Sequence, residues 1–175
     1  MTSYYIYLIS SLPELRFGDK PPFSLEEFLN ICSRAISDKD LERLIKELTS
    51  LYGSIDKGLL PRLKEWRRFN RSLRNELVKL RAKRKNEEAL KYLRADDNPF
   101  TPATHTALLA YRNRNILDAE KFLDLERWRF LDGLSCGHYF DIILLVIYAL
   151  KLKILLRWDN VYASDKDRLL EEALK

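Results

Sequence analysis

The sequence predicts an all-α protein, a single helical domain over residues 1–175 with a long basic helix packed in a hairpin and one highly apolar central helix. All six prolines lie in or beside stretches that we expect to be loops, and the tracts between them carry apolar residues at helical spacing. A chain of this length is also able to bury about 70% of the surface that it exposes when unfolded.

Cys32 and Cys136 are the two cysteines of the chain, too few for a disulfide framework, and they lie in no paired motif. We therefore expect a reducing compartment and thiols that are buried or inert. The short apolar opening is followed at once by Pro13 and Glu14, which is not the pattern of a signal peptide. These features predict a cytoplasmic location.

The stretch Tyr4–Ile9 contrasts with the helical remainder, because its aromatic and β-branched residues are typical of a strand. Its local pattern leaves open whether it forms a strand or a helix.

The first well-marked helix begins after Ser24. Ser24 and Glu27 have the spacing of a capping box, and Phe23 and Phe28 occupy the two positions of a hydrophobic staple.

A second helix is predicted from about Ser37 to Tyr52. Ser37 and Asp40 repeat the capping pattern more weakly, and an apolar stripe ends at Gly53. The stripe consists of Leu41, Leu44, Ile45, Leu48 and Leu51.

The longest predicted helix is basic and runs from Arg62 to Arg94. An apolar seam with heptad spacing predicts that it packs against another helix of the same chain. The loop Arg94–Pro102 then turns the chain, and a helix from about Asn115 to Leu134, with Gly133 near its end, can supply the partner. The seam residues are Leu63, Trp66, Asn70, Leu73, Leu77 and Leu80.

The most apolar stretch of the chain is Ile142–Leu156, interrupted by Lys151 and Lys153. It is shorter than the ~20 successive apolar residues of a bilayer-spanning helix. Because its first turns are apolar on all sides, we expect the most buried helix of the core. A further helix start is predicted at Ser164, with Asp167 three residues later.

Positive charge is concentrated in the basic helix. Residues 57–94 contain 14 Lys and Arg against four Glu, so with a whole-chain charge of +5 the remainder carries −5. Such a cluster is either a surface that meets phosphates, acidic lipid or an acidic protein, or only a solvated helix face. If the seam points inward, the cations point outward. The candidate partner-binding residues are Arg67, Arg68, Arg71, Arg74, Arg81, Lys83, Arg84 and Lys85.

A helical nucleic-acid-binding protein is the alternative. Trp66, Phe69 and Tyr92 lie among the arginines, and bases stack on such rings. The position of Trp66 on the seam favours a core role instead.

Residues that could carry chemistry are few, and we expect no catalytic residue, cofactor or metal site. His105 and His138 have no ligand spacing to each other or to a cysteine. Asp96 and Asp97 have the composition of an ordinary turn. A helix break at Gly133 and Gly137 explains the proximity of Ser135, Cys136 and His138 better than an activated thiol does. The sequence therefore favours a binding or assembly protein over an enzyme.

Two segments resemble a bacterial family of unknown function whose genes accompany those of rotary V/A-type ATPases. They are YYIYLISSLPELRFGDKPPFSLEEFLNIC (residues 4–32) and YALKLKILLRW (residues 148–158). That family in turn is similar to a reduced form of the C-type ATPase subunit (the d-type subunit of eukaryotes), the all-helical socket between the central rotor shaft and the membrane proteolipid ring. Leu155 and Leu156 stand where acidic residues would be expected, and the chain is about half as long as a full C-type subunit.

The resemblance implies a non-catalytic subunit or assembly factor that acts through contacts with the ATPase rotor shaft and proteolipid ring. It would be peripheral to the inner membrane through that complex. The resemblance also implies that Tyr4–Ile9 is buried chain with an architectural role. The last residues, DRLLEEALK, stop within a helical pattern, so we expect the chain to be the N-terminal part of a longer one.

Overall fold

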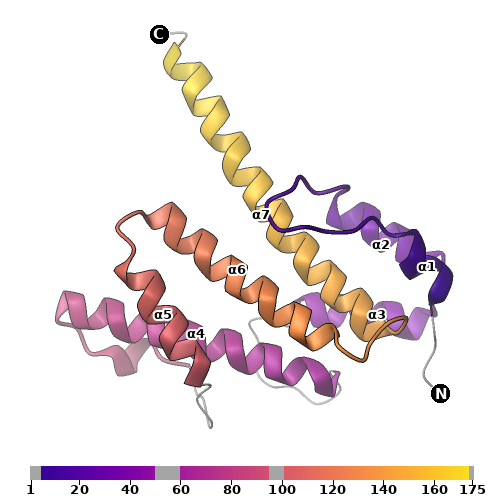
Figure 1. Cartoon of the computed structure of the whole chain (residues 1–175), viewed down its shortest axis with the longest axis horizontal. Coiled ribbons are helices and arrows are strands. Elements are labelled where there is room, and N and C mark those ends of the chain that lie inside the picture. The colour runs from indigo at the N-terminus through magenta and orange to yellow at the C-terminus, as the bar shows by residue number, and fades with distance from the viewer. Residues whose placement is uncertain (1–4, 50–59, 95–100, 174–175) are drawn as a thin grey trace. The chain divides into compact units, whose positions relative to one another are not determined.

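The computed structural model describes residues 5–49, 60–94 and 101–173, and for 101 and 165–173 it describes the backbone alone. This part of the chain contains helices and no strand, so the all-α prediction is confirmed (Figure 1). The helices are α1 (Ile6–Ser11), α2 (Leu25–Ser33), α3 (Asp38–Thr49), α4 (Lys64–Lys85), α5 (Thr101–Arg112), α6 (Ile116–Ser135) and α7 (Ile142–Ala173), with short 3-10 helices η2 (Pro61–Leu63) and η3 (Ala89–Tyr92).

The chain divides into two compact units. Unit 1 comprises residues 1–52 and 135–175 and contains α1, α2, α3 and α7. Unit 2 comprises residues 53–134 and contains α4, α5 and nearly all of α6. The single domain predicted for residues 1–175 stays a prediction.

Helix α2 in unit 1 begins as the sequence predicts. The Ser24 Oγ accepts a hydrogen bond from the Glu27 backbone N–H at 3.1 Å, and the Glu27 carboxylate accepts one from the Ser24 N–H at 2.7 Å. The rings of Phe23 and Phe28 stack with centroids 6.3 Å apart, as a hydrophobic staple requires. The capping box and the staple are both confirmed.

Helix α3 also begins where its weaker signal indicates, because the Ser37 Oγ accepts the Asp40 N–H at 3.3 Å. Its buried face includes Leu44 and Leu48, while Ile45 is 41% exposed. Lys153 of α7 donates to the Leu48 carbonyl at 3.3 Å and so links α3 to α7. The predicted end of this helix, residues 50–52, lies outside the described residues.

Helix α7 contains the most buried stretch of the chain, as predicted. Leu145, Val146 and Ile147 are at most 1% exposed, and burial continues to Trp158. The separate start predicted at Ser164 is wrong, because α7 continues through it to Ala173. Instead of capping a new helix, the Ser164 hydroxyl donates to the Asn160 carbonyl one turn earlier. Among the described helices, none combines the length and the apolar content needed to cross a bilayer.

Helix α1 settles the conformation of the opening stretch, which is helical from Ile6 in spite of its strand propensity. The expectation that this stretch is buried is wrong for most of it, since Tyr7 is 95% exposed and Ile6 55%, and only Leu8 is buried. A helix of six residues has fewer than two turns, so only a few of its side chains can face the core. Tyr4 lies outside the described residues.

Tyr5 fastens this short helix to the rest of unit 1. Its N–H donates to the Phe140 carbonyl at 2.6 Å, and its hydroxyl donates to the Asp40 carboxylate, which also accepts from Arg43 at 3.0 Å. Burial alone would raise the pKa of Asp40, but the hydrogen bonds from Tyr5 and Arg43 outweigh it and hold the pKa below its ordinary value.

Helix α4 in unit 2 is shorter than the predicted span 62–94. It ends at Lys85, because Asn86 adopts a left-handed conformation (φ 55°) and the Glu87 N–H closes on the Ala82 carbonyl at 3.0 Å. The chain then returns along the helix. The buried Asn75 side chain donates to the Arg94 carbonyl at 2.9 Å and accepts the Arg94 N–H at 3.0 Å.

Helix α5, which the sequence pattern does not predict, is the helix whose backbone approaches α4 most closely. Ala103, Ala107 and Ala110 lie on one face of α5 and are at most 3% exposed. Side chains this small let two helices pack at short range. The same residues give a weak hydrophobic periodicity, which is why the helix escapes prediction.

The predicted partner helix, α6, also contacts α4, through side chains. The rings of Phe69 and Phe130 stack at 4.4 Å, Arg127 donates to Asn70 at 3.2 Å, and Arg81 pairs with Glu120 at 3.9 Å. Later residues of α4 contact earlier residues of α6, so the two helices are antiparallel. In the described part of unit 2, α4 therefore packs against both α5 and α6, where the sequence predicted a single partner helix.

An aspartate at position 147 should destabilise the fold severely. Ile147 is 1% exposed, and an unpaired carboxylate there would cost roughly 3–5 kcal/mol or more, a large part of a domain's total stability. Thermal unfolding followed by circular dichroism should show a strongly lowered Tm or no transition for I147D. The matched control is I116D, at an isoleucine that is 81% exposed, whose Tm should be nearly that of the wild type. Equal Tm values for I147D and the wild type would place this part of α7 outside the core.

Loss of the Tyr5 hydroxyl should reduce stability in a pH-dependent way. Because the pKa of Asp40 is lowered in the folded state, its stabilising effect is full above the unfolded-state pKa and is lost as the pH falls through the folded-state value. Y5F should therefore cost about 1–2 kcal/mol near neutral pH and much less at an acid pH below the lowered pKa of Asp40.

Urea unfolding at both pH values measures this difference. Y7F, at the 95% exposed neighbour, is the control and should cost nothing at either pH. A cost for Y5F that is the same at both pH values would show that the hydroxyl does not act through the charged carboxylate.

Candidate basic interaction surface

The eight candidate residues on the basic helix are not equally accessible. Arg67 is buried, with 6% of its surface exposed, and Arg68 and Arg71 are half-buried. The expectation that the seam leaves every arginine pointing outward is therefore wrong for Arg67. The five exposed members are Arg74, Arg81, Lys83, Arg84 and Lys85.

The width of the packed face explains this division. Helix α6 packs on the N-terminal half of α4, because Trp66 and Phe69 pack with Phe130 and Arg127 donates to Asn70. This half buries more than one heptad stripe, including Phe69 and Ser72 beside the seam residues Trp66 and Leu73. Arg67 lies next to Trp66 within this half. Farther along, the seam itself is less covered, and Leu77 and Leu80 are half-buried.

Accessible positive charge therefore gathers in the C-terminal half of α4. We call Arg74, Arg81, Lys83, Arg84 and Lys85 the basic surface. Arg81 pairs with Glu120 at 3.9 Å, although 63% of the Arg81 side chain stays exposed. Lys83, Arg84 and Lys85 have no ion-pair partner among the residues that the structure describes. Their charge is available to a partner.

Two of the three aromatic residues proposed to stack on bases are inaccessible. Trp66 is 5% exposed and Phe69 3%, and both rings pack with Phe130 of α6. Only Tyr92, which is 53% exposed, could meet a base. The aromatic part of the nucleic-acid interpretation is therefore reduced to one residue.

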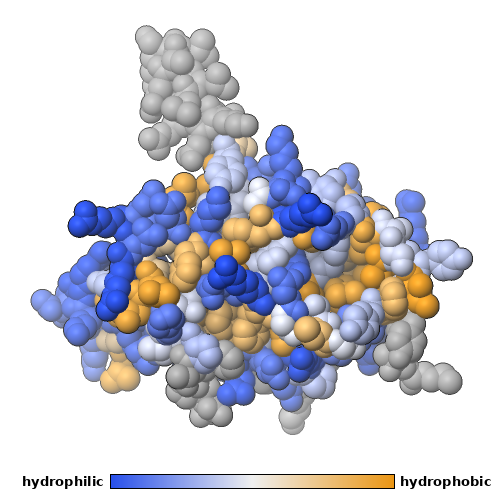
Figure 2. Space-filling view, viewed as in Figure 1, coloured by the Kyte–Doolittle hydropathy of each residue, from blue (hydrophilic) through white to orange (hydrophobic). Residues whose placement is uncertain are grey.

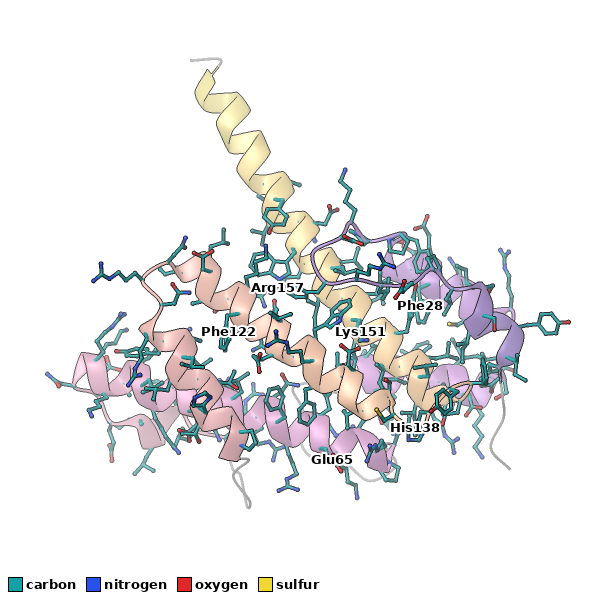
Figure 3. The ribbon with its side chains drawn as sticks, in the orientation of Figure 1. Phe28, Glu65, Phe122, His138, Lys151 and Arg157 are labelled. Atoms are coloured by element: carbon teal, nitrogen blue, oxygen red, sulfur yellow. The ribbon has the colours of Figure 1, made fainter. Side chains whose placement is uncertain are left out.

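His138 has a local partner in the connection between α6 and α7 (Figure 3). Its Nδ1 lies 2.5 Å from the Asp141 carboxylate, which also accepts the Leu144 N–H at 3.1 Å and so caps α7. The pair holds the start of the longest helix. Its neighbour Cys136 is exposed, so of the two expected states, buried or inert, burial does not apply to this thiol.

The structure also bears on the other residues that the sequence analysis considered for chemistry or for a helix break. Helix α6 ends at Ser135, one residue from its predicted end and between Gly133 and Gly137, and Gly137 adopts a positive φ of 85°. Cys32 is buried, and burial raises the pKa of its thiol to about 12. No group of three metal-ligating side chains occurs in the part of the chain that the structure describes, and Asp96 and Asp97 lie outside it.

The two segments that carry the family resemblance meet in unit 1. The Tyr148 hydroxyl of α7 donates to the Pro13 carbonyl at 2.9 Å. Its ring stacks on Phe28 with centroids 5.3 Å apart and lies 6.3 Å from Phe23. Burial raises the pKa of Tyr148 to about 12. This cluster has no signal in the sequence, because a pattern of residues does not show which distant segments pack together.

No family model, curated protein or solved structure matches the chain in a significant way.

Charge reversal should separate the buried arginine from the exposed ones. R67E places a carboxylate at a site that is 6% exposed and should cost roughly 3 kcal/mol or more. R74E makes the same change at an exposed position of the same helix and should change stability by about 0.5 kcal/mol at most. Urea unfolding of the two variants measures the difference. Equal costs would mean that Arg67 is as accessible as Arg74.

Proposed function

We propose that the protein is a non-catalytic subunit or assembly factor of a V/A-type rotary ATPase, similar to the C-type subunit. It would act on the cytoplasmic side of the membrane through contacts with the rotor shaft and the proteolipid ring. The proposal begins from the resemblance of residues 4–32 and 148–158 to the ATPase-associated family.

The observation that carries the proposal is the contact between these two segments. Tyr148 is the first residue of the second segment, and it packs on Phe23 and Phe28 and hydrogen-bonds to Pro13, all of which belong to the first. Segments 116 residues apart that resemble the same family would be expected to form one structural element if the resemblance reflects a common core. Their joint packing supports that interpretation.

The basic surface supports a role in assembly. A concentration of exposed Lys and Arg steers association with a negatively charged partner and raises the rate of encounter. Charged residues at the rim of an interface contribute to specificity and association rate more than to folding. Arg74 and Arg81 of the basic surface would therefore serve the contact with an acidic face of another subunit.

A helical nucleic-acid-binding protein is the second candidate, and the same five cations favour it. Their charge would serve as phosphate contacts, and affinity would then fall linearly with the logarithm of salt concentration. The burial of Trp66 and Phe69 counts against base stacking in this role.

An affinity purification from the source cell tests the proposal. The tagged full chain should retain ATPase subunits after nuclease treatment, and R74E/R81E should reduce their recovery about tenfold while leaving the fold intact. The matched control is R34E/K39E, which reverses two exposed cations in unit 1 and should leave recovery unchanged.

Two results would contradict the proposal. Absence of ATPase subunits from the wild-type eluate would remove the assignment to this complex. Recovery that is nucleic acid alone, lost on nuclease treatment, would favour the second candidate.

A further inference from the structure

The turn between α5 and α6 exposes two large aliphatic side chains. Ile116 is 81% exposed and Leu117 is 41% exposed. The turn is held by asparagine side chains, since the Asn113 carbonyl oxygen accepts the Asn115 N–H at 3.2 Å and that of Asn115 accepts the Leu117 N–H at 2.9 Å. These bonds fix the start of α6 with its first residues facing water. Neither aliphatic side chain is explained by core packing.

Cations flank this apolar pair on its own segments. Arg112 and Arg114 precede it and Lys121 follows it, and all three are exposed. Asp118 and Glu120 are the acidic residues nearest in sequence, and Glu120 is engaged by Arg81 at 3.9 Å. Asp118 is exposed too, so the turn presents its aliphatic tip among three exposed cations and one exposed acid.

The end of the basic surface lies at the same end of unit 2. The α4–α6 contacts are antiparallel, passing from Asn70 with Arg127 to Arg81 with Glu120. One further turn along each helix leads to Lys85 on α4 and to Ile116 on α6. Figure 1 shows the end of α4 and the α5–α6 turn at the left of the view. In Figure 2 the same end shows hydrophobic residues among strongly hydrophilic ones.

We propose that this end of unit 2 binds an anionic membrane surface. Ile116 and Leu117 enter the interfacial region of the bilayer. Lys83, Arg84 and Lys85 at the end of α4 and the cations of the turn lie against lipid phosphates and carboxylates, which leaves Arg74 and Arg81 for the subunit contact. Peripheral binding of this kind gains from buried apolar area and from attraction to anionic lipid together. The inference goes beyond the proposed ATPase role and does not depend on it.

The aliphatic tip is what favours lipid over the other anionic partners. A nucleic-acid backbone offers phosphates, which the cations alone would contact. It offers no apolar region that would cover an isoleucine that is 81% exposed. An acidic protein could cover the tip, but it would need an apolar pocket at one fixed place. A bilayer interface accepts both features without such a pocket.

Vesicle sedimentation with the full chain tests the proposal. The wild-type protein should bind vesicles that contain phosphatidylserine in phosphatidylcholine and should bind pure phosphatidylcholine only weakly. I116S/L117S and K83E/R84E/K85E should each weaken binding to the anionic vesicles about tenfold or more. Circular dichroism should show that both variants keep the wild-type helix content and Tm.

Matched controls use exposed residues of unit 1. I6S/Y7S removes a comparable apolar surface, and K20E/R34E/K39E reverses the same number of charges. Both controls should bind like the wild type. Equal loss in a control and in its matched variant would show that the effect is not specific to this end of unit 2.

Four results would overturn the proposal. The first is no binding to anionic vesicles, and the second is equal binding to both vesicle types. The third is full vesicle binding by I116S/L117S. The fourth is binding of a DNA or RNA oligonucleotide in place of vesicles, which would assign the cations to phosphate alone. Because the assay contains no ATPase components, a failure of the ATPase proposal would not change its outcome.

Discussion

The burial of the first half of α7 is the constraint on which unit 1 depends. This stretch is apolar on all sides, so each of its faces must be covered if it is to be stable in water. Helices α2 and α3 supply part of that cover. Their own positions are fixed at the ends, by the capping box at Ser24 and by the Lys153 bond to the Leu48 carbonyl. One local signal, the capping box, and one long-range bond, from Lys153 to Leu48, thus fix the ends of the short helices beside α7.

Prediction from the sequence succeeded best where a short stretch decides the outcome. The capping box and staple at Ser24 involve neighbouring residues and appear as predicted. The local pattern of the α1 stretch left strand or helix open, and the bonds that hold its start, from Tyr5 to Phe140 and to Asp40, join residues far apart in the sequence. Helix α5 was not predicted, for a different reason. Its small buried alanines carry little hydrophobic periodicity, and their role, close packing of the two helices, is evident only from the contact with α4.

The candidate surface was predictable in composition and not in exposure. Counting charges located the basic helix, but the accessibility of each cation depends on which faces of α4 its neighbours cover. A single narrow seam would leave Arg67 in water, whereas the wider packed face of the N-terminal half buries it. The same covering removes Trp66 and Phe69 from the set of stacking residues. Tertiary contacts, which the sequence pattern does not contain, therefore decided which half of the helix can meet a partner.

Helix stability explains only part of the charge on α4. Cations in the last turn interact favourably with the helix dipole, which gives Lys83, Arg84 and Lys85 a structural role worth about 0.3–1 kcal/mol each. That effect falls off within one turn, so it does not account for Arg74, which lies 11 residues before the last residue of the helix. Arg74 is exposed, and the residue four positions later is Val78, so no helical ion pair accounts for it in that direction. Its charge adds nothing evident to folding, which is the property expected of a residue that contributes to a binding surface.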